Sequence, residues 1–186
     1  MKRILALTLA LMFVFCLTGC KDSKTNKKNS VDIEYYAKLG QMPENEITLG
    51  TKPEDVKAVL DKRANESDDS HEHGGYNVIE GENNVLIEEG AYDYYYKKAE
   101  PEKGVGYIIS YGESFGFKTG EIIVEMEEAL KSYDVKKEKA TESNAFFFIG
   151  DYNNAQILKI AFEKNTVLFL FENNVLCATA IYRNNF

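Results

Sequence analysis

The sequence predicts an α+β fold in which short helices pack on one face of an antiparallel sheet. A helical pattern occurs twice, 70 residues apart, and each copy is followed by segments with the two-residue period of strands. Connections of hairpin length join these segments, which favours antiparallel neighbours. We therefore expect one or two tandem units, each a helix followed by an antiparallel meander.

The N-terminal segment, residues 1–19, has the pattern of a secretory signal peptide. Lys2 and Arg3 precede an apolar or small run from Ile4 to Thr18, and about 15 residues is short of the roughly 20 that span a bilayer. The run ends in Leu17-Thr18-Gly19-Cys20. The alternatives are an uncleaved membrane anchor, which the short run disfavours, and a chance cysteine after an ordinary secretory signal, which the small residues before Cys20 disfavour.

This start resembles the precursors of bacterial lipoproteins, and Leu17–Cys20 is similar to their lipobox. The resemblance implies that residues 1–19 are removed and that Cys20 becomes an N-terminus carrying acyl chains such as palmitate, several of which anchor a protein stably. It also implies that the protein is attached to the cell membrane and lies on the extracytoplasmic side of that membrane. That side is the cell surface in a single-membrane host and the periplasmic face in a two-membrane host.

Residues 20–45 are predicted to form the lipidated N-terminus and a disordered tether. Lys21–Ser30 contains four lysines, one aspartate and no large apolar residue, so it cannot bury a core. The whole chain has 22 basic and 30 acidic residues, and without residues 1–30 the rest keeps a net charge of −13. Such a domain is repelled by anionic lipid and nucleic acid, so no nucleic-acid partner is expected.

The first α+β unit is expected over residues 46–118. Thr51-Lys52-Pro53-Glu54 is a capping box with proline in the first turn, and an apolar stripe after it predicts a helix over 52–63. Strand patterns follow at Tyr92–Lys97 and Val105–Tyr111, with weaker ones at Tyr76–Glu80 and Val85–Glu89.

The second unit is expected over residues 119–186. Apolar residues at i, i+4, i+7, i+8 and i+11 predict a helix from Ile122 to Tyr133. Four strands are then expected, at Ala145–Ile149, Gln156–Glu163, Val167–Glu172 and Val175–Tyr182.

The repeated opening, Gly50 to Leu60 and again Gly120 to Leu130, each followed by a meander, resembles the beta-lactamase-inhibitor-protein-like fold. The SmpA/OmlA outer-membrane lipoproteins share that fold, and the resemblance covers roughly residues 46 to 186. It implies a non-catalytic role in which another protein is held against the sheet. We therefore expect a protein or cell-envelope partner bound through the sheet face or the hairpin loops, no cofactor and no enzyme activity.

Tyrosines in the first unit are the candidate binding residues. Alternation places Tyr92, Tyr94 and Tyr96 on one face of their strand, and Tyr107 and Tyr111 on one face of the next. A hairpin could lay the two sets side by side. Tyrosine offers a large contact area at little entropic cost, although the same rings could instead form core beneath a helix.

Two further patterns favour other functions. Gly112-Glu113-Ser114-Phe115-Gly116 matches the G-x-S-x-G motif, in which Ser114 would be the nucleophile of a serine hydrolase. That chemistry needs a helix directly after the serine and a later histidine, and the sequence has neither. Asp69, His71 and His73 could bind Zn²⁺, but they lie on a single loop. We therefore expect neither a catalytic set nor a metal site.

Overall fold

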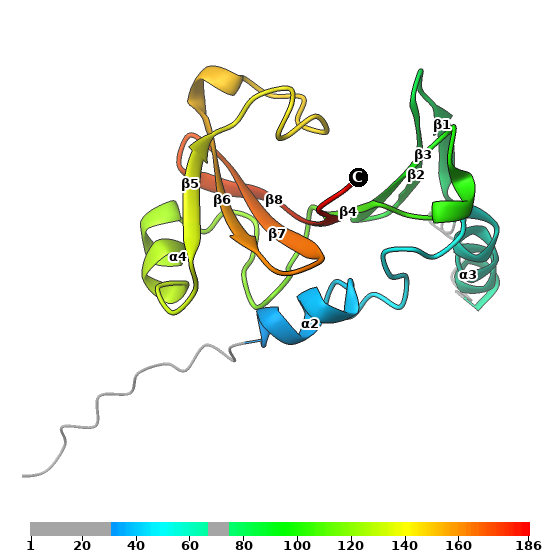
Figure 1. Cartoon of the computed structure of the whole chain (residues 1–186), viewed down its shortest axis with the longest axis horizontal. Helices are drawn as coiled ribbons and strands as arrows, with labels where there is room; N and C mark the ends of the chain where they lie inside the picture. Colours follow the sequence, from blue (N-terminus) through cyan, green and yellow to red (C-terminus); the bar gives the residue numbers. More distant parts are fainter. Residues whose placement is uncertain (1–30, 67–74) are drawn as a thin grey trace, which may run out of the picture. The chain divides into compact units, whose positions relative to one another are not determined.

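A computed structural model of the chain describes residues 31–66 and 75–186 (Figure 1). In these residues the helices are α2 (Ile33–Leu39), α3 (Pro53–Glu66) and α4 (Ile123–Ala129), with short 3₁₀ turns η1 (Pro101–Lys103) and η2 (Tyr152–Asn154). The strands are β1 (Asn77–Glu80), β2 (Asn84–Glu89), β3 (Tyr92–Lys97), β4 (Tyr107–Ser110), β5 (Val135–Lys139), β6 (Ala155–Ala161), β7 (Asn165–Glu172) and β8 (Val175–Arg183). The predicted α+β class and antiparallel sheet agree with this structure, but the sheet, rather than the helices, dominates it.

The described strands form one eight-stranded antiparallel sheet in the order β1-β2-β3-β4-β8-β7-β6-β5. β1–β4 and β5–β8 are each a run of sequential hairpins, and the two runs meet where β4 pairs with β8. α3 precedes the first run and α4 precedes the second. The first strands of the two runs, β1 and β5, consequently lie at opposite edges of the sheet.

The two expected helices form, with different lengths from those predicted. α3 has Glu54 and Asp55 in its first turn, where carboxylates interact favourably with the helix dipole. α4 ends at Ala129 rather than at Tyr133, because Leu130 leaves the helical backbone (φ −94°, ψ 2°). Leu130 is nevertheless buried, so its place in the core does not require it to be helical.

The predicted tether over residues 20–45 is wrong in its C-terminal part, because α2 forms within it. The Asp32 carboxylate accepts a hydrogen bond from the Tyr35 N–H (3.0 Å), and Gly40 ends the helix at φ +66°. Ile33 and Ala37, four residues apart, are buried. The Asn165 side chain on β7 donates to the Ala37 carbonyl (2.7 Å), so this segment belongs to the folded domain.

The strand predicted at Ala145–Ile149 is wrong, and β5 (Val135–Lys139) forms instead. Five consecutive apolar residues cannot all face one side of a sheet. Their backbone forms turns, and the Tyr152 hydroxyl donates to the carbonyls of Ala145 and Phe148 (3.0 Å each). β5 contains three lysines and lies at a sheet edge, where charge protects against pairing with another chain.

Buried apolar side chains form two clusters. The first contains buried side chains of α2, α3 and α4, such as Ile33, Val56 and Met126, together with Tyr94 and Phe169 of the sheet. The second contains Tyr107, Ile109 and Leu168 with Ala145 and Phe147 from the connection before η2. Because neighbouring residues of a strand point to opposite faces, the clusters lie on opposite faces of the sheet. Figure 1 shows the connection from β5 to η2, in yellow and orange, on the side away from α2.

Candidate functional site

A row of apolar side chains crosses five strands on the face of the second cluster, called here the second face. Directly paired residues of antiparallel strands project to the same side. The register pairs Ile79 with Leu86, Leu86 with Tyr95, Tyr95 with Tyr107, and Tyr107 with Tyr182. We call these five residues the aromatic row. Tyr107 is buried, Tyr95, Tyr182 and Leu86 are half-buried, and Ile79 at the β1 end is 48 % exposed.

The predicted pairing of the two tyrosine sets is wrong. Tyr94 lies opposite Ile108, and Tyr95 rather than Tyr94 lies opposite Tyr107. Tyr92, Tyr94 and Tyr96 consequently pack with the first cluster, where Tyr94 and Tyr96 are buried and Tyr92 is half-buried. These side chains contribute to the core, as the alternative interpretation anticipated, and do not form an exposed platform. Among the five predicted tyrosines, Tyr107 is buried on the second face and Tyr111 is exposed.

Aromatic rings from outside the row pack onto its centre. Phe146, from the connection between β5 and η2, meets Tyr95 and Tyr107 edge-on, with centroids 5.1 Å away in both cases. Phe186 lies 6.1 Å from Tyr107 and accepts the Lys97 ammonium at 5.4 Å from its ring centroid. Such ring–ring and cation–ring contacts fix the positions of these side chains on the surface.

Two apolar side chains project from the same connection into solvent. Phe146 is 38 % exposed although its ring touches the row, and Ile149 is 100 % exposed. A large apolar side chain that is exposed and contacts an aromatic surface, as Phe146 does, is typical of recognition sites. The sequence run 145–149, misassigned as a strand, therefore supplies part of the candidate surface.

Carboxylates border the aromatic row. Asp93 lies directly opposite Glu88, on the same face as Tyr95. The Tyr111 hydroxyl donates to Asp93 Oδ2 (2.8 Å). Burial raises the pKa of Asp93, the Tyr111 hydrogen bond lowers it, and Glu88 raises it, with a net increase. Burial, together with the Asp93 charge, also raises the pKa of Tyr111.

Ser114 lies in a tight turn. Its N–H and carbonyl exchange hydrogen bonds with Phe117, while Phe115 and Gly116 between them have positive φ (54° and 77°). The buried Ser114 hydroxyl contacts Met42 Sδ at 3.5 Å. In the only cysteine that the structure describes, Cys177, burial raises the thiol pKa to about 11, which disfavours the nucleophilic thiolate.

The other predicted positions are Cys20, Asp69, His71 and His73, and all four lie outside the described residues. Within residues 31–66 and 75–186, His, Cys, Asp and Glu side chains form no group of three or more that could hold a metal ion. In the same residues no helix is both long enough and apolar enough to cross a membrane.

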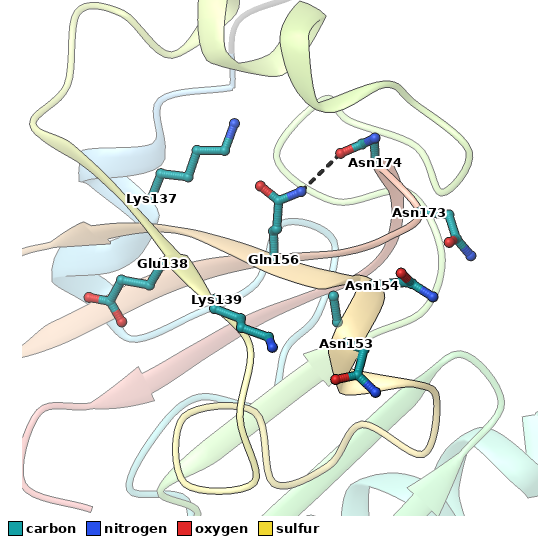
Figure 2. A pocket seen from close by; sticks show the side chains of 9 residues that line it. Lys137, Glu138, Lys139, Asn153, Asn154, Gln156, Asn173 and Asn174 are labelled. Atoms are coloured by element: carbon teal, nitrogen blue, oxygen red, sulfur yellow. Dashed lines mark hydrogen bonds between the residues drawn. The ribbon is translucent and has the colours of Figure 1, made fainter.

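A polar depression of about 560 Å³ lies between β5, η2 and the turn joining β7 to β8 (Figure 2). Its side chains are amides and charges: Lys137, Glu138, Lys139, Asn153, Asn154, Gln156, Asn173 and Asn174. Turn chemistry explains two of these amides. Asn173 and Asn174 have positive φ (52° and 67°), as the central positions of a type I′ hairpin require. Gln156 Nε2 donates to Asn174 Oδ1 (2.9 Å).

Sequence reasoning missed Tyr95, Tyr182 and Phe146 as members of the surface. Tyr182 ends a strand whose apolar pattern gave no reason to single it out, and Phe146 lay in a segment assigned to the sheet. The sequence feature that could have indicated this surface is the run Phe146-Phe147-Phe148-Ile149, which has more consecutive apolar residues than one face of a strand can bury. Comparison of the chain with protein-family models, with curated proteins and with solved structures gives no match in any of the three.

Proposed function

We propose that this chain is a lipid-anchored, extracytoplasmic protein that binds another protein of the cell envelope through the second face of its sheet, without catalysis. The observation that carries the proposal is the aromatic row, which extends across five strands and is contacted by the partly exposed Phe146. Aromatic side chains with a polar border are typical of binding hot spots.

We also propose that the domain consists of two tandem copies of one unit, with the helices on the face opposite the aromatic row. The order of elements supports this, since α3 precedes β1–β4 and α4 precedes β5–β8. Each of the three described helices contributes buried side chains to the first cluster. This arrangement leaves the second face to be covered by strand side chains, the connection before η2 and a partner.

Lipid anchoring at Cys20 rests on Leu17-Thr18-Gly19-Cys20 and the apolar run before it. Mass spectrometry of the N-terminal peptide from membrane-purified chain tests it. We expect a peptide beginning at acylated Cys20, and Cys20→Ser should abolish both the acylation and membrane retention. An unmodified Cys20 in a chain that retains residues 1–19 would contradict the assignment.

Photocrosslinking in intact cells tests the binding surface. Benzoylphenylalanine replaces Ile149, which is fully exposed three residues after the row-contacting Phe146, or Val124 on α4 as a control. Val124 is also an exposed aliphatic residue (66 %). We expect a discrete adduct from position 149 that is absent from position 124. The same adducts from both positions, or none from 149, would count against the second face as the binding surface.

Replacing aromatic side chains then tests the chemistry of that surface. Tyr95→Ser and Phe146→Ser should each weaken the adduct formed at position 149, because each removes a ring of the surface. Tyr35→Ser is the matched control, since Tyr35 is an exposed tyrosine (55 %) on α2. Unchanged crosslinking in folded Tyr95→Ser and Phe146→Ser chains would contradict a role for the aromatic row.

A further inference from the structure

The pair formed by Glu88 and Asp93 is an unfavourable arrangement within the chain. The two residues lie directly opposite each other on β2 and β3, and like charges in that position are destabilising. Asp93 is only 9 % exposed. Neither carboxylate forms an ion pair within residues 31–66 and 75–186. Among the described residues, the Tyr111 hydroxyl stabilises one of the two charges, but no cation offsets the repulsion between them.

Glu89, the next residue along β2, lies on the other face and has a cationic partner. Glu89 receives Arg63 Nη1 at 2.8 Å and the Tyr94 hydroxyl at 3.3 Å. Lys98 and Glu80 likewise pair at 2.6 Å. The chain thus supplies cations to other acids of β1 and β2, while the pair itself has none in the described part.

The surroundings of the pair suit a cation with an apolar stem. The Tyr111 hydroxyl bonds to Asp93 Oδ2, and Oδ1 has no hydrogen bond among the described residues. Tyr111 is 41 % exposed, and Tyr95 lies two positions along the chain from Asp93 on the same face. Tyrosine rings attract guanidinium and ammonium groups, and carboxylates bind them by charge-assisted hydrogen bonds.

Resting on the function proposed above, we infer that Glu88 and Asp93 recognise an arginine or lysine side chain of the protein partner, whose adjacent apolar residues lie on the aromatic row. Charge complementarity favours a basic partner segment at this position. Residues 31–186 carry a net charge of −13, so a second copy of the chain or an anionic lipid surface would be repelled. A basic segment of a partner is attracted and relieves the repulsion between the two carboxylates.

Two model peptides test the inference: acetyl-Arg-Leu-amide and acetyl-citrulline-Leu-amide, which differ by the charge of one side chain. Each is titrated against the full chain in phospholipid nanodiscs while backbone amide NMR shifts are followed. We expect saturable shifts at Glu88, Asp93 and Tyr95 with the arginine peptide, and binding about tenfold weaker with the citrulline peptide. Equal binding of the two peptides, or no shifts at these residues, would overturn the inference.

Charge variants provide the matched controls. Asp93→Asn and Glu88→Gln should each remove the preference for arginine, whereas Glu125→Gln, an exposed acid on α4, should retain it. The midpoint of urea unfolding should not fall in Asp93→Asn, because that change removes repulsion, and this verifies folding. Shifts produced at the same residues by CaCl₂ with higher affinity than by the arginine peptide would show a metal site instead.

The experiments distinguish failure of the cation site from failure of the proposed binding face. If the position-149 adduct persists in Asp93→Asn and Glu88→Gln while the arginine preference is absent in the parent chain, the cation site is wrong and the binding face stands. If no adduct forms at position 149 in the parent chain, the proposed function itself fails.

Discussion

The Tyr107 ring lies parallel to the Tyr182 ring, with centroids 4.6 Å apart and an interplanar angle of 2°. The two residues are directly paired between β4 and β8, the strands that join the two halves of the sheet. Tyr107 is buried and Tyr182 is half-buried. This one contact therefore links the halves and also forms part of the aromatic row.

Replacing Tyr107 by alanine should lower the free energy of unfolding by about 3–5 kcal/mol, because a large buried ring is lost and a cavity remains. Tyr182→Ala should cost less, since its ring is already half in solvent. A double-mutant cycle should give a coupling of about 1 kcal/mol for the stacked pair. Urea denaturation measures all three values, and strict additivity would show that stacking contributes nothing beyond burial.

The domain should lose stability in alkali because several tyrosines are buried. Burial raises the pKa of Tyr94 and Tyr107 above the ordinary value of 10.0, and it raises that of Tyr95 to about 12. The folded state favours the neutral phenols, so their contribution is complete below pH 10 and is lost as the pH rises through the folded-state pKa values.

The urea midpoint should thus be constant from about pH 7 to about pH 9 and lower at about pH 11. Absorbance of tyrosinate near 295 nm, followed in parallel, should increase together with unfolding. Full ionisation of the twelve tyrosines in a chain that stays folded would contradict the burial described here.

Arg63 should matter more for stability than its neighbour Lys62. Arg63 is 30 % exposed and binds both Glu46 (3.1 Å) and Glu89 (2.8 Å). Arg63→Ala should cost about 2 kcal/mol, because Glu89 is left without its cation in a partly buried site. Lys62→Ala is the control: its contact with Glu66 is 3.8 Å long and exposed, so its loss should cost under about 0.5 kcal/mol. Similar losses in thermal unfolding for both variants would contradict this ranking.

Gly106 provides the space that the Phe186 ring occupies. A Cβ atom at Gly106 would lie 1.8 Å from Phe186 Cδ2, so Gly106→Ala must displace the ring from Tyr107. We expect Gly106→Ala to lower the melting temperature, and to lower it less in a chain that already carries Phe186→Ala. An equal effect in both backgrounds would place the cost in the backbone rather than in the displaced ring.

Local pattern was sufficient for most strands of the sheet. Tyr92–Lys97 forms β3 as predicted, and the strands near 85–89, 167–172 and 175–182 differ from prediction by one or two residues at their ends. These segments have apolar side chains at alternate positions or an unbroken apolar run between turn residues, and both patterns reflect burial. β5 lacks such a pattern, because it is an exposed edge strand whose lysines need no core contact.

The sequence alone could not predict the register between β3 and β4, which decides which tyrosines lie on the candidate surface. Both faces of β3 pack against other side chains, so alternation does not reveal whether Tyr94 or Tyr95 faces Tyr107. The connection through η1 decides it, together with the hydrogen bond from the Gly106 N–H to the Tyr95 carbonyl (2.8 Å). A change of one residue in this register exchanges the faces of every side chain on the strand.

α2 gives the domain a mechanical property. The helix comes first in the described chain, and it contacts β7 of the second half rather than the strands that follow it directly. Tension arriving from the N-terminal side must pass through this seven-residue helix before it reaches the sheet. With few buried side chains holding it, α2 should detach at lower force than the hydrogen-bonded strands, so the chain lengthens while the sheet stays intact.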